Sequence, residues 1–287
     1  GVVGLSGRGM GLLCELIAMP DVVVPAVCDL YEDRKENGVK TVAEKAGYKA
    51  EGYHDYRELC ARDDLDAVIV PASWNAHYEV CIAAMKAGKY VATEVGGAYS
   101  VNECWELVRT SEATGMPCSM LENACYSRHE LALLNMVKQG IFGEIIHIQG
   151  GYEHDLREEV SCGRENRHYR FANYANRNGE LYPTHELGPM CKYIGINRGN
   201  RLVSLTSMSS KARGLRDYIL EKRGRDSDIA DLEWTQGDIV TTMIKCAHGE
   251  TMLLVHDTTL PRPYSRNGRL QGTRGLWMED GDLVYID

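Results

Sequence analysis

The sequence has no excess of positive charge, because 32 lysine and arginine residues stand against 41 aspartate and glutamate residues, a net charge of −9. Proteins that grip nucleic acid or anionic membranes without sequence preference need a basic face. The sequence also has no run of about 18 apolar residues, the length that a transmembrane helix requires. We therefore expect a small-molecule ligand, and no nucleic acid or membrane as partner.

Metal-binding motifs are absent as well. The ten cysteines form no C-x-x-C pair, and the histidines show no H-E-x-x-H spacing. Most cysteines fall within helix or strand patterns, so we interpret them as small buried hydrophobic residues, which weakly favours a reducing compartment. We predict no bound metal.

The chain of 287 residues is 44% hydrophobic, enough for a sizeable core, and its length favours two domains. Its first residues resemble a strand, so no signal peptide is visible. Because residues 1–4 and 284–287 both look like strand interiors, we expect a fragment of a longer gene product. Localisation is therefore not predicted from the sequence.

Phenylalanine is scarce, with two residues against sixteen tyrosines. Three of these tyrosines, two arginines and two histidines lie between His168 and Pro189, a stretch without apolar periodicity. Such side chains bind hydroxyls and move protons, so we predict a long loop that carries an active site. An ordinary surface loop rich in turn-forming residues is the alternative.

The beginning of the chain has a pattern typical of dinucleotide binding. A short apolar strand, residues 2–5, leads into Gly4-Leu5-Ser6-Gly7-Arg8-Gly9 and then into an amphipathic helix. A second strand, residues 22–28, ends at Asp29, where a carboxylate can accept hydrogen bonds from the adenosine ribose. The glycine turn, in which Ser6 replaces the middle glycine, and Asp29 together favour NAD over NADP; alternatively Asp29 is only a helix cap.

The pattern then alternates between strands and helices up to Asn123, which predicts a doubly wound parallel sheet of the Rossmann type in residues 1–123. Ligands bind beyond the carboxyl ends of such strands. This rule brings residues 74–77, 94–97 and 122–123 around one crevice. We therefore predict an NAD-binding domain with its site at this edge.

Residues 124–287 are predicted to form a substrate-binding α+β domain with an open, mostly antiparallel sheet. Its strands are expected near residues 144–150, 201–209, 238–246 and 251–256, with a hairpin turn at 247–249. One sheet face would remain free to pair, so we expect a homo-oligomer through the open sheet. Residues 211–236 are charged and weakly patterned, which favours a mobile or irregular insertion.

Two segments carry a resemblance to a known family. Pro-Ala-Ser-Trp-Asn-Ala-His at 71–77 and Ala-Gly-Lys-Tyr-Val-Ala-Thr-Glu at 87–94 resemble the glucose-fructose oxidoreductase/inositol dehydrogenase/MocA family. In its sugar dehydrogenases a Lys-Pro pair follows the glutamate, and the lysine accepts a proton. This chain has Val95-Gly96 there, which argues against ordinary dehydrogenase turnover.

Further motifs, at residues 121–123, 150–157, 177–185 and 257–266, are similar to glycoside hydrolase family 109, NAD-dependent glycosidases first known as α-N-acetylgalactosaminidases. The resemblance implies these cofactor contacts: Gly7, Arg8, Asp29, Trp74, Asn75, Ala76, His77, Glu94, Val95, Asn123 and Tyr182. It implies these sugar contacts: Tyr152, Arg170, Tyr182, Pro183, Thr184, His185 and Tyr264.

The resemblance also implies a mechanism, in which transient oxidation at sugar C3 permits elimination of the C1 substituent and addition of water. His185 is then expected to handle the 3-hydroxyl proton and Tyr152 the C2 proton, with Glu122 completing the catalytic set. Two alternatives share the same motifs: an NAD-dependent sugar dehydrogenase, and an NAD-binding protein without turnover.

One position departs from the resemblance, because Glu186 follows His185 where the family is expected to have glycine. A carboxylate facing the pocket would raise the pKa of His185 and favour hydroxyl- or cation-bearing sugars. Since a loop glutamate is more often solvated, we expect Glu186 to be a surface charge.

Overall fold

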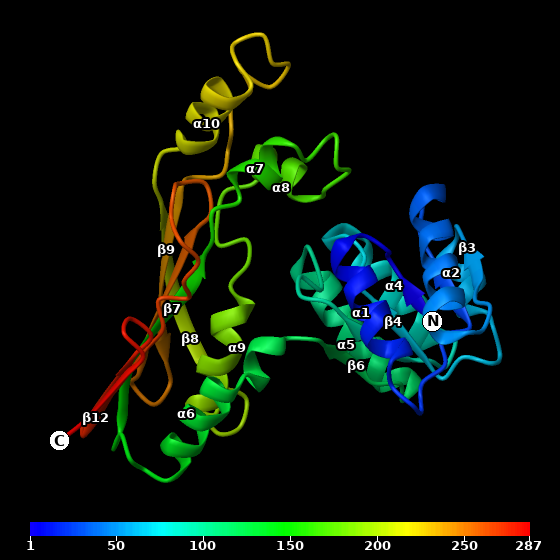
Figure 1. The fold of residues 1–287 in the computed structure, drawn as a ribbon. Helices are drawn as coiled ribbons and strands as arrows, with labels where there is room; N and C mark the ends of the chain where they lie inside the picture. The colour runs from blue at the N-terminus through cyan, green and yellow to red at the C-terminus, as the bar shows by residue number, and fades with distance from the viewer. The chain divides into compact units, whose positions relative to one another are not determined.

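The computed structural model describes all residues, Gly1–Asp287, and divides into two compact units, Gly1–Leu121 and Glu122–Asp287 (Figure 1). The domain boundary predicted from the sequence, after Asn123, lies two residues later in the chain. Each unit has its own sheet. No helix is both long enough and apolar enough to cross a membrane.

The first unit contains a six-stranded parallel sheet in the order β3-β2-β1-β4-β5-β6. The chain winds outward in opposite directions from β1, so the strand order reverses between β1 and β4, as the Rossmann prediction requires. The strands are β1 (Val2–Val3), β2 (Ala26–Cys28), β3 (Glu51–Tyr53), β4 (Ala67–Val70), β5 (Tyr90–Thr93) and β6 (Cys118–Met120).

Five helices connect these strands: α1 (Gly7–Ile17), α2 (Glu32–Ala46), α3 (Tyr56–Cys60), α4 (Trp74–Lys86) and α5 (Val101–Thr114). Local sequence fixes several of their ends. Ser100 and Glu103 form a reciprocal capping box at the start of α5, and Gly115 ends that helix in the left-handed conformation. Pro25 cannot donate a ladder hydrogen bond, so β2 begins only at Ala26, later than predicted.

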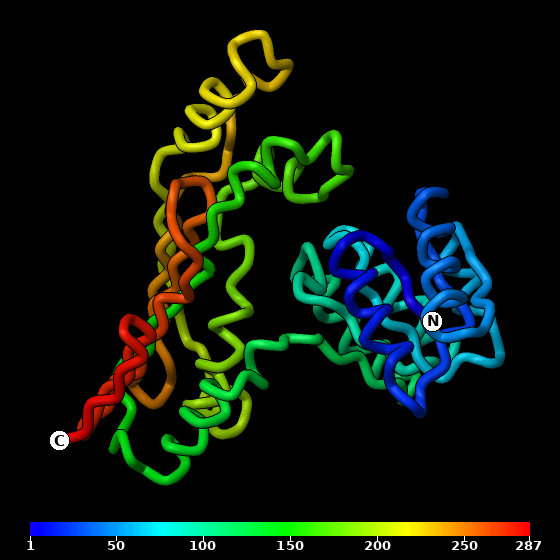
Figure 2. The backbone as a smooth tube through the Cα atoms, viewed as in Figure 1, coloured from blue at the N-terminus to red at the C-terminus, as the bar shows by residue number.

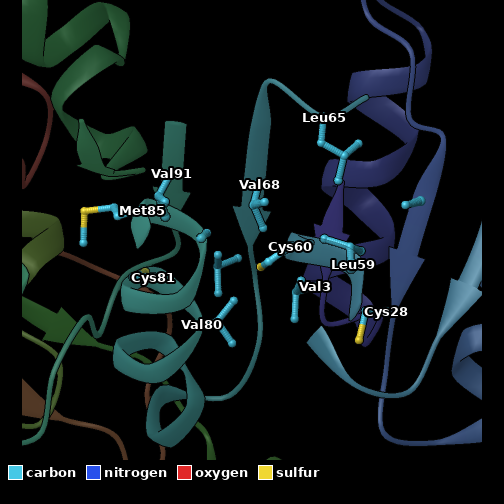
Figure 3. Packing of buried hydrophobic residues seen from close by; sticks show 13 residues of the cluster. Val3, Cys28, Leu59, Cys60, Leu65, Val68, Val80, Cys81, Met85 and Val91 are labelled. Atoms are coloured by element: carbon cyan, nitrogen blue, oxygen red, sulfur yellow. The ribbon is translucent and has the colours of Figure 1, made fainter. Parts of the chain in front are cut away.

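One core cluster of the first unit gathers side chains from β1, β2, β4, β5 and helices α3 and α4 (Figure 3), and a second gathers side chains from β1, β2, α1 and α2. In the first cluster Val68 and Val91 of the sheet and Val80 and Met85 of α4 are almost inaccessible to solvent. Burying a side chain of this size stabilises the fold by about 1.5–3 kcal/mol. This packing fixes the strand ends from which the candidate cofactor residues project.

The second unit contains a seven-stranded sheet in the order β13-β12-β11-β7-β10-β9-β8. Only the central β7 and β10 pair in parallel, so the prediction of a mostly antiparallel sheet is confirmed. The strands are β7 (Ile145–Glu153), β8 (Leu202–Ser209), β9 (Ile239–Cys246), β10 (Thr251–Asp257), β11 (Arg269–Gly272), β12 (Gly275–Met278) and β13 (Leu283–Ile286).

The helices of the second unit correct two predictions. The stretch 168–189 is not one long loop, because it forms most of two helices around a short connection, and residues 211–236 contain a regular helix (Figure 2). Both segments lack strong apolar periodicity, so the sequence patterns did not reveal them. The helices are η1 (Asn123–Tyr126), α6 (Arg128–Lys138), α7 (Arg157–Ser161), α8 (Arg170–Asn176), α9 (Thr184–Tyr193) and α10 (Gly214–Lys222).

Helix α9 packs against β7, β10 and α6, and so covers the middle of the sheet (Figure 1). Edge strand β8 differs, since every one of its residues is exposed. Large apolar side chains such as Leu205 and Met208 lie on it, 64% and 74% exposed. One side of the sheet thus supports a packed site, whereas β8 remains open.

Candidate functional site

The glycine turn of the first unit is shaped for close approach of an anion. Gly4 has φ 106°, and a Cβ on Gly9 would lie 1.9 Å from the Gly4 carbonyl oxygen, so both positions require glycine. A Cβ on Gly7 would meet no atom within 4 Å. Helix α1 begins there without a side-chain cap or an acidic residue in its first turn. Its N–H groups therefore suit a dinucleotide phosphate.

Asp29 lies directly after β2 and is buried. Its Oδ2 accepts from the Leu5 backbone N–H at 2.7 Å, and its Oδ1 accepts from the Tyr31 N–H at 3.0 Å. These bonds hold the carboxylate between the ends of β1 and β2. Each oxygen keeps a further lone pair, so Asp29 can still accept from ribose hydroxyls.

The first turn of α4 holds Trp74, Asn75, Ala76 and His77. His77 is buried, and its Nε2 lies 2.8 Å from the Ala72 carbonyl oxygen, to which it must donate. Burial lowers the pKa of His77, so the ring is neutral and its Nδ1 is an acceptor. That atom is buried without a protein partner, which fits a bound cofactor group.

Glu94 and Val95 follow β5 at the same edge of the sheet. Glu94 forms a 2.6 Å ion pair with Arg8 Nε and also accepts from the Val95 N–H at 3.1 Å. The next residue, Gly96, has φ 128°, and a Cβ there would lie 2.3 Å from the Trp74 ring. The strand ends therefore bring Arg8, Trp74 and Glu94 to one edge, with a tight glycine turn in place of Lys-Pro.

Two residues predicted to contact the cofactor, Asn123 and Tyr182, belong to the second unit. Asn123 is exposed at the start of η1, and Tyr182 is buried in the connection before α9.

In the second unit Glu122, which is buried, and His185, which is partly exposed, form a hydrogen-bonded pair. The Glu122 Oε1 lies 2.7 Å from His185 Nδ1 and also accepts from the Ala124 N–H at 3.0 Å. A carboxylate accepts only, so Nδ1 carries the proton and the other nitrogen of a neutral ring, Nε2, has a free lone pair. An imidazole that a carboxylate orients in this way can act as a general base, as in a catalytic triad.

Three aromatic side chains surround His185. The ring centroid of Tyr152 lies 4.7 Å from that of Tyr182 and 5.7 Å from that of His185, and Tyr182 lies 5.0 Å from His185. Tyr264 approaches Tyr152 edge-on at 6.4 Å but remains 51% exposed. The structure thus groups Tyr152, Tyr182, His185 and Tyr264, which are distant in sequence, while Pro183 and Thr184 begin α9 beside them.

Arg170, at the start of α8, places its guanidinium over two of these rings. Its Cζ lies 5.0 Å from the Tyr182 centroid and 5.7 Å from the Tyr152 centroid. The side chain is buried and forms a 2.9 Å ion pair with Glu159. A buried cation of this kind can donate to sugar hydroxyls while it holds the two tyrosines in place.

Two histidines beside Tyr152 were not singled out by sequence reasoning. His154 Nδ1 lies 3.1 Å from the Tyr152 hydroxyl. Burial lowers the pKa of His154 and raises the pKa of Tyr152 to about 12, so near pH 7 both are neutral. Residues two apart on an extended chain point to the same face, so His154, directly after the end of β7, lies on the same side as Tyr152.

His256 is the second missed residue. It lies on β10 directly opposite Tyr152 of β7, is 0% exposed, and has no hydrogen-bond partner at either ring nitrogen. Burial lowers its pKa to about 3, and Arg170 adds to this effect. A neutral, unpartnered imidazole 6.4 Å from the Tyr152 ring leaves hydrogen-bonding capacity next to the site. The sequence pattern predicted only the strand that carries it.

Glu186 corrects a prediction, because it is not a surface charge. The residue is 4% exposed in the first turn of α9, where its side chain packs against Gly150 and lies 3.7 Å from Arg266 Nε. Burial raises the pKa of Glu186 well above its usual value, and nearby Glu130 adds to the shift. The sequence suggested a loop here, whereas the helix turns this side chain inward.

Solved structures with the same architecture include scyllo-inositol dehydrogenase from Lactobacillus casei with bound NAD(H) and scyllo-inositol. It has a TM-score of 0.75 at 16% identity, covering 97% of this chain and 74% of that chain. The myo-inositol 2-dehydrogenase from Lactobacillus plantarum has a TM-score of 0.74 at 18% identity, covering 96% and 74%. At such identities these matches show the fold alone.

Sequence relatives agree over the whole chain. It is 40% identical to an alpha-N-acetylgalactosaminidase from Tannerella forsythia, covering 100% of this chain and 66% of the relative. It is also 40% identical to a glycosyl hydrolase family 109 protein from Stenotrophomonas maltophilia, covering 100% and 68%. The chain therefore spans about two thirds of the length of these relatives.

Family models match both units. Residues 1–121 match the oxidoreductase family with an NAD-binding Rossmann fold, and residues 126–287 match the C-terminal domain of glycosyl hydrolase 109. The first match identifies NAD as the cofactor of the first unit. With an NAD-binding domain followed by this C-terminal domain, the chain belongs to glycosyl hydrolase family 109.

Proposed function

We propose that this protein is an NAD-dependent glycoside hydrolase that acts on α-N-acetylgalactosaminides or related glycosides. The observation that carries the proposal is the Glu122–His185 pair, which lies beside Tyr152 and Tyr182 in a chain of this family. A histidine that a carboxylate holds at Nδ1, beside hydroxyl-bearing rings, is suited to handling a sugar hydroxyl at Nε2.

In the proposed reaction, NAD held at the glycine turn and Asp29 would supply a reversible hydride acceptor for C3 of the sugar. His185 Nε2 takes the proton of the 3-hydroxyl, and Glu122 stabilises the resulting imidazolium. The carbonyl formed at C3 acidifies the C2 proton, so the C1 substituent can leave by elimination. Water then adds across the C1–C2 double bond. This route needs no pair of catalytic carboxylates at C1.

Tyr152 is assigned to the C2 proton, together with His154. A phenol whose pKa is raised to about 12 is a weak base by itself near neutral pH, because its proton remains bound. The Tyr152 hydroxyl can pass that proton to His154 Nδ1, 3.1 Å away, while its oxygen takes the proton from C2. The pair therefore acts as one proton acceptor.

The turn after Glu94 supports the glycosidase over the dehydrogenase alternative. Glu94 is followed by Val95, which is buried, and by Gly96, which packs on the Trp74 ring. This turn therefore offers no lysine to accept a proton from a sugar hydroxyl. The Glu122–His185 pair provides such an acceptor in the second unit instead.

One experiment tests this function: incubation of the purified protein with a panel of aryl glycosides, without added cofactor. Release of the aryl group without net NADH supports the glycosidase. Accumulation of NADH from free sugars with added NAD supports the dehydrogenase, and the absence of both reactions supports an NAD-binding protein without turnover. In deuterated water, the glycosidase product should carry deuterium at C2, and a product without it would exclude elimination.

We also propose that the protein assembles as a homo-oligomer through the open sheet. Leu205 and Met208 are exposed on opposite faces of the edge strand β8, and Met243 of β9 shares the face of Met208. An edge strand that is exposed along its whole length and carries apolar side chains favours association with another chain.

A further inference from the structure

Glu186 is connected to the proposed sugar site through one side chain. Its Oε1 lies 3.7 Å from Arg266 Nε, and that same Nε–H donates to the Tyr264 hydroxyl at 3.1 Å. Glu186 and Arg266 are mostly buried, whereas Tyr264 is half exposed. A buried carboxylate, a guanidinium and an exposed phenol are thus linked in series.

The backbone around Arg266 is held independently of Glu186. The Glu279 Oε2 accepts from the N–H groups of Arg266 and Gly268 at 2.9 and 3.0 Å. The Arg266 carbonyl oxygen accepts from the Gly151 N–H of β7 at 2.6 Å. Loss of the Glu186 carboxyl group would therefore release only the side chain of Arg266 and leave its loop in place.

Several acidic side chains lie around Arg266. Glu186 and Glu130 both act on its guanidinium, whereas Glu279 accepts from its backbone N–H. Among these acidic side chains Glu186 is the one within 4 Å of Nε, the atom that donates to Tyr264. Removing it takes away the carboxyl group nearest to the donating end of the guanidinium.

From this geometry we propose that Glu186 is a positioning residue for substrate recognition, which acts through Arg266 to fix the Tyr264 side chain beside the sugar site. The role in recognition rests on the proposed function. The Tyr264 ring is half exposed and meets Tyr152 and His154 only edge-on, so a fixed donor at its hydroxyl restricts its orientation further. A relative with glycine at this position would lack the carboxylate and hold Tyr264 less firmly.

The first test does not depend on activity. NMR of the Arg266 Nε–H group, assigned by its loss in Arg266→Lys, should show slow hydrogen exchange in the parent protein. Glu186→Gln keeps the packing against Gly150 but removes the carboxyl group, and should speed this exchange by about tenfold or more. Glu130→Gln is the comparison variant: Glu130 also acts on the guanidinium, but it bonds Tyr193 and has no ion-pair contact with Arg266, so it should speed the exchange clearly less.

The second test is a double-mutant cycle with an aryl α-N-acetylgalactosaminide. Glu186→Gln alone should raise KM about three- to tenfold and change kcat less than about twofold. In a Tyr264→Phe background the same change should alter KM less than about twofold, because the residue through which it acts no longer has its hydroxyl. A merely structural role would give additive effects.

Each outcome decides the proposal. Unchanged Nε–H exchange in Glu186→Gln overturns it whether or not the protein is active, and additive KM effects overturn the role in recognition. If the parent releases no aryl group, the proposed function fails, while the exchange measurement still decides the link to Arg266. Should Glu186→Gln fold poorly, Glu186→Met fills the same space without a charge and is held to the same expectations.

Discussion

The candidate cofactor residues of the first unit lie in short segments directly after strands β1, β2, β4 and β5, whereas the candidate sugar residues of the second unit come from distant parts of the chain. The cofactor edge uses mainly backbone geometry: glycines at Gly4 and Gly9, the start of α1, and the carboxylate of Asp29. The sugar cluster uses buried side chains from η1, β7, α8 and α9.

This difference shows how each kind of recognition is encoded. Backbone N–H groups at a glycine turn recognise a phosphate that is common to many dinucleotide enzymes, so a local motif suffices. A sugar offers several hydroxyls with fixed directions, so its recognition needs polar side chains converging from several elements. Changes in the second unit should therefore affect turnover and specificity, and changes in the first should affect cofactor affinity.

The largest expected effect separates the two regions. His185→Gln removes the oriented base and should lower kcat by about 10²–10⁴-fold, the usual contribution of general base catalysis. NAD affinity, measured by calorimetry, should change less than about twofold. A parallel loss of NAD affinity would contradict the division of roles between the units. Glu122→Gln should give a smaller loss of kcat, since it disturbs only the orientation of His185.

The next effect concerns Asp29 in the first unit. Asp29→Ala should weaken NAD binding by about 1.5–3 kcal/mol, or roughly tenfold to a hundredfold, because charge-assisted hydrogen bonds to the ribose are lost. The preference for NAD over NADP should narrow as well. Kcat at saturating NAD should stay near the parent value. Asp33→Ala, at an exposed position in α2, is the control. If the parent and Asp29→Ala bind each dinucleotide with equal affinity, Asp29 does not contact the ribose.

A third prediction uses pH to examine the second unit. Burial lowers the pKa of His256 from 6.5 to about 3, so the unfolded chain protonates this ring before the folded protein does. The unfolding free energy should therefore fall as the pH drops from about 6.5 towards 3, by up to about 1.4 kcal/mol per pH unit.

Replacing His256 should reduce this pH dependence. Denaturant unfolding measures the decrease in unfolding free energy between pH 7 and pH 5. For His256→Gln this decrease should be smaller than for the parent by about 2 kcal/mol. His129→Gln, at an exposed histidine, serves as the control and should follow the parent. If the unfolding free energy of the parent and of His256→Gln decreases equally from pH 7 to pH 5, the buried His256 ring is not the source of the pH dependence.

The smallest effect on chemistry should come from the open edge. Leu205→Lys and Met208→Lys place charges on the exposed β8 strand and should reduce the oligomeric mass measured by light scattering, while kcat changes less than about twofold. Glu36→Lys, on the exposed side of α2, controls for the added charge. A parent protein that is already monomeric would rule out assembly through this sheet.

The sequence predicted the first unit better than the second, for physical reasons. Alternating strands and helices determine a parallel sheet almost by themselves, and the helix from 101 to 114 has a capping box that fixes its start. In the second unit, α9 contains Pro189 and polar residues whose burial depends on the sheet beneath them. No local pattern shows that Glu186 turns inward or that β10 places His256 under Tyr152.

The packing of Glu186 against Gly150 links two positions that are 36 residues apart in the sequence. A Cβ on Gly150 would lie 2.7 Å from Glu186 Cγ, so an alanine at position 150 requires the Glu186 side chain to shift. Relatives should therefore show covariation: a glutamate at position 186 should occur with glycine at position 150, and a larger residue at 150 should occur where the residue at 186 is small. The order of substitution in the lineage is then biased, since the acidic side chain is most easily acquired where β7 already has glycine.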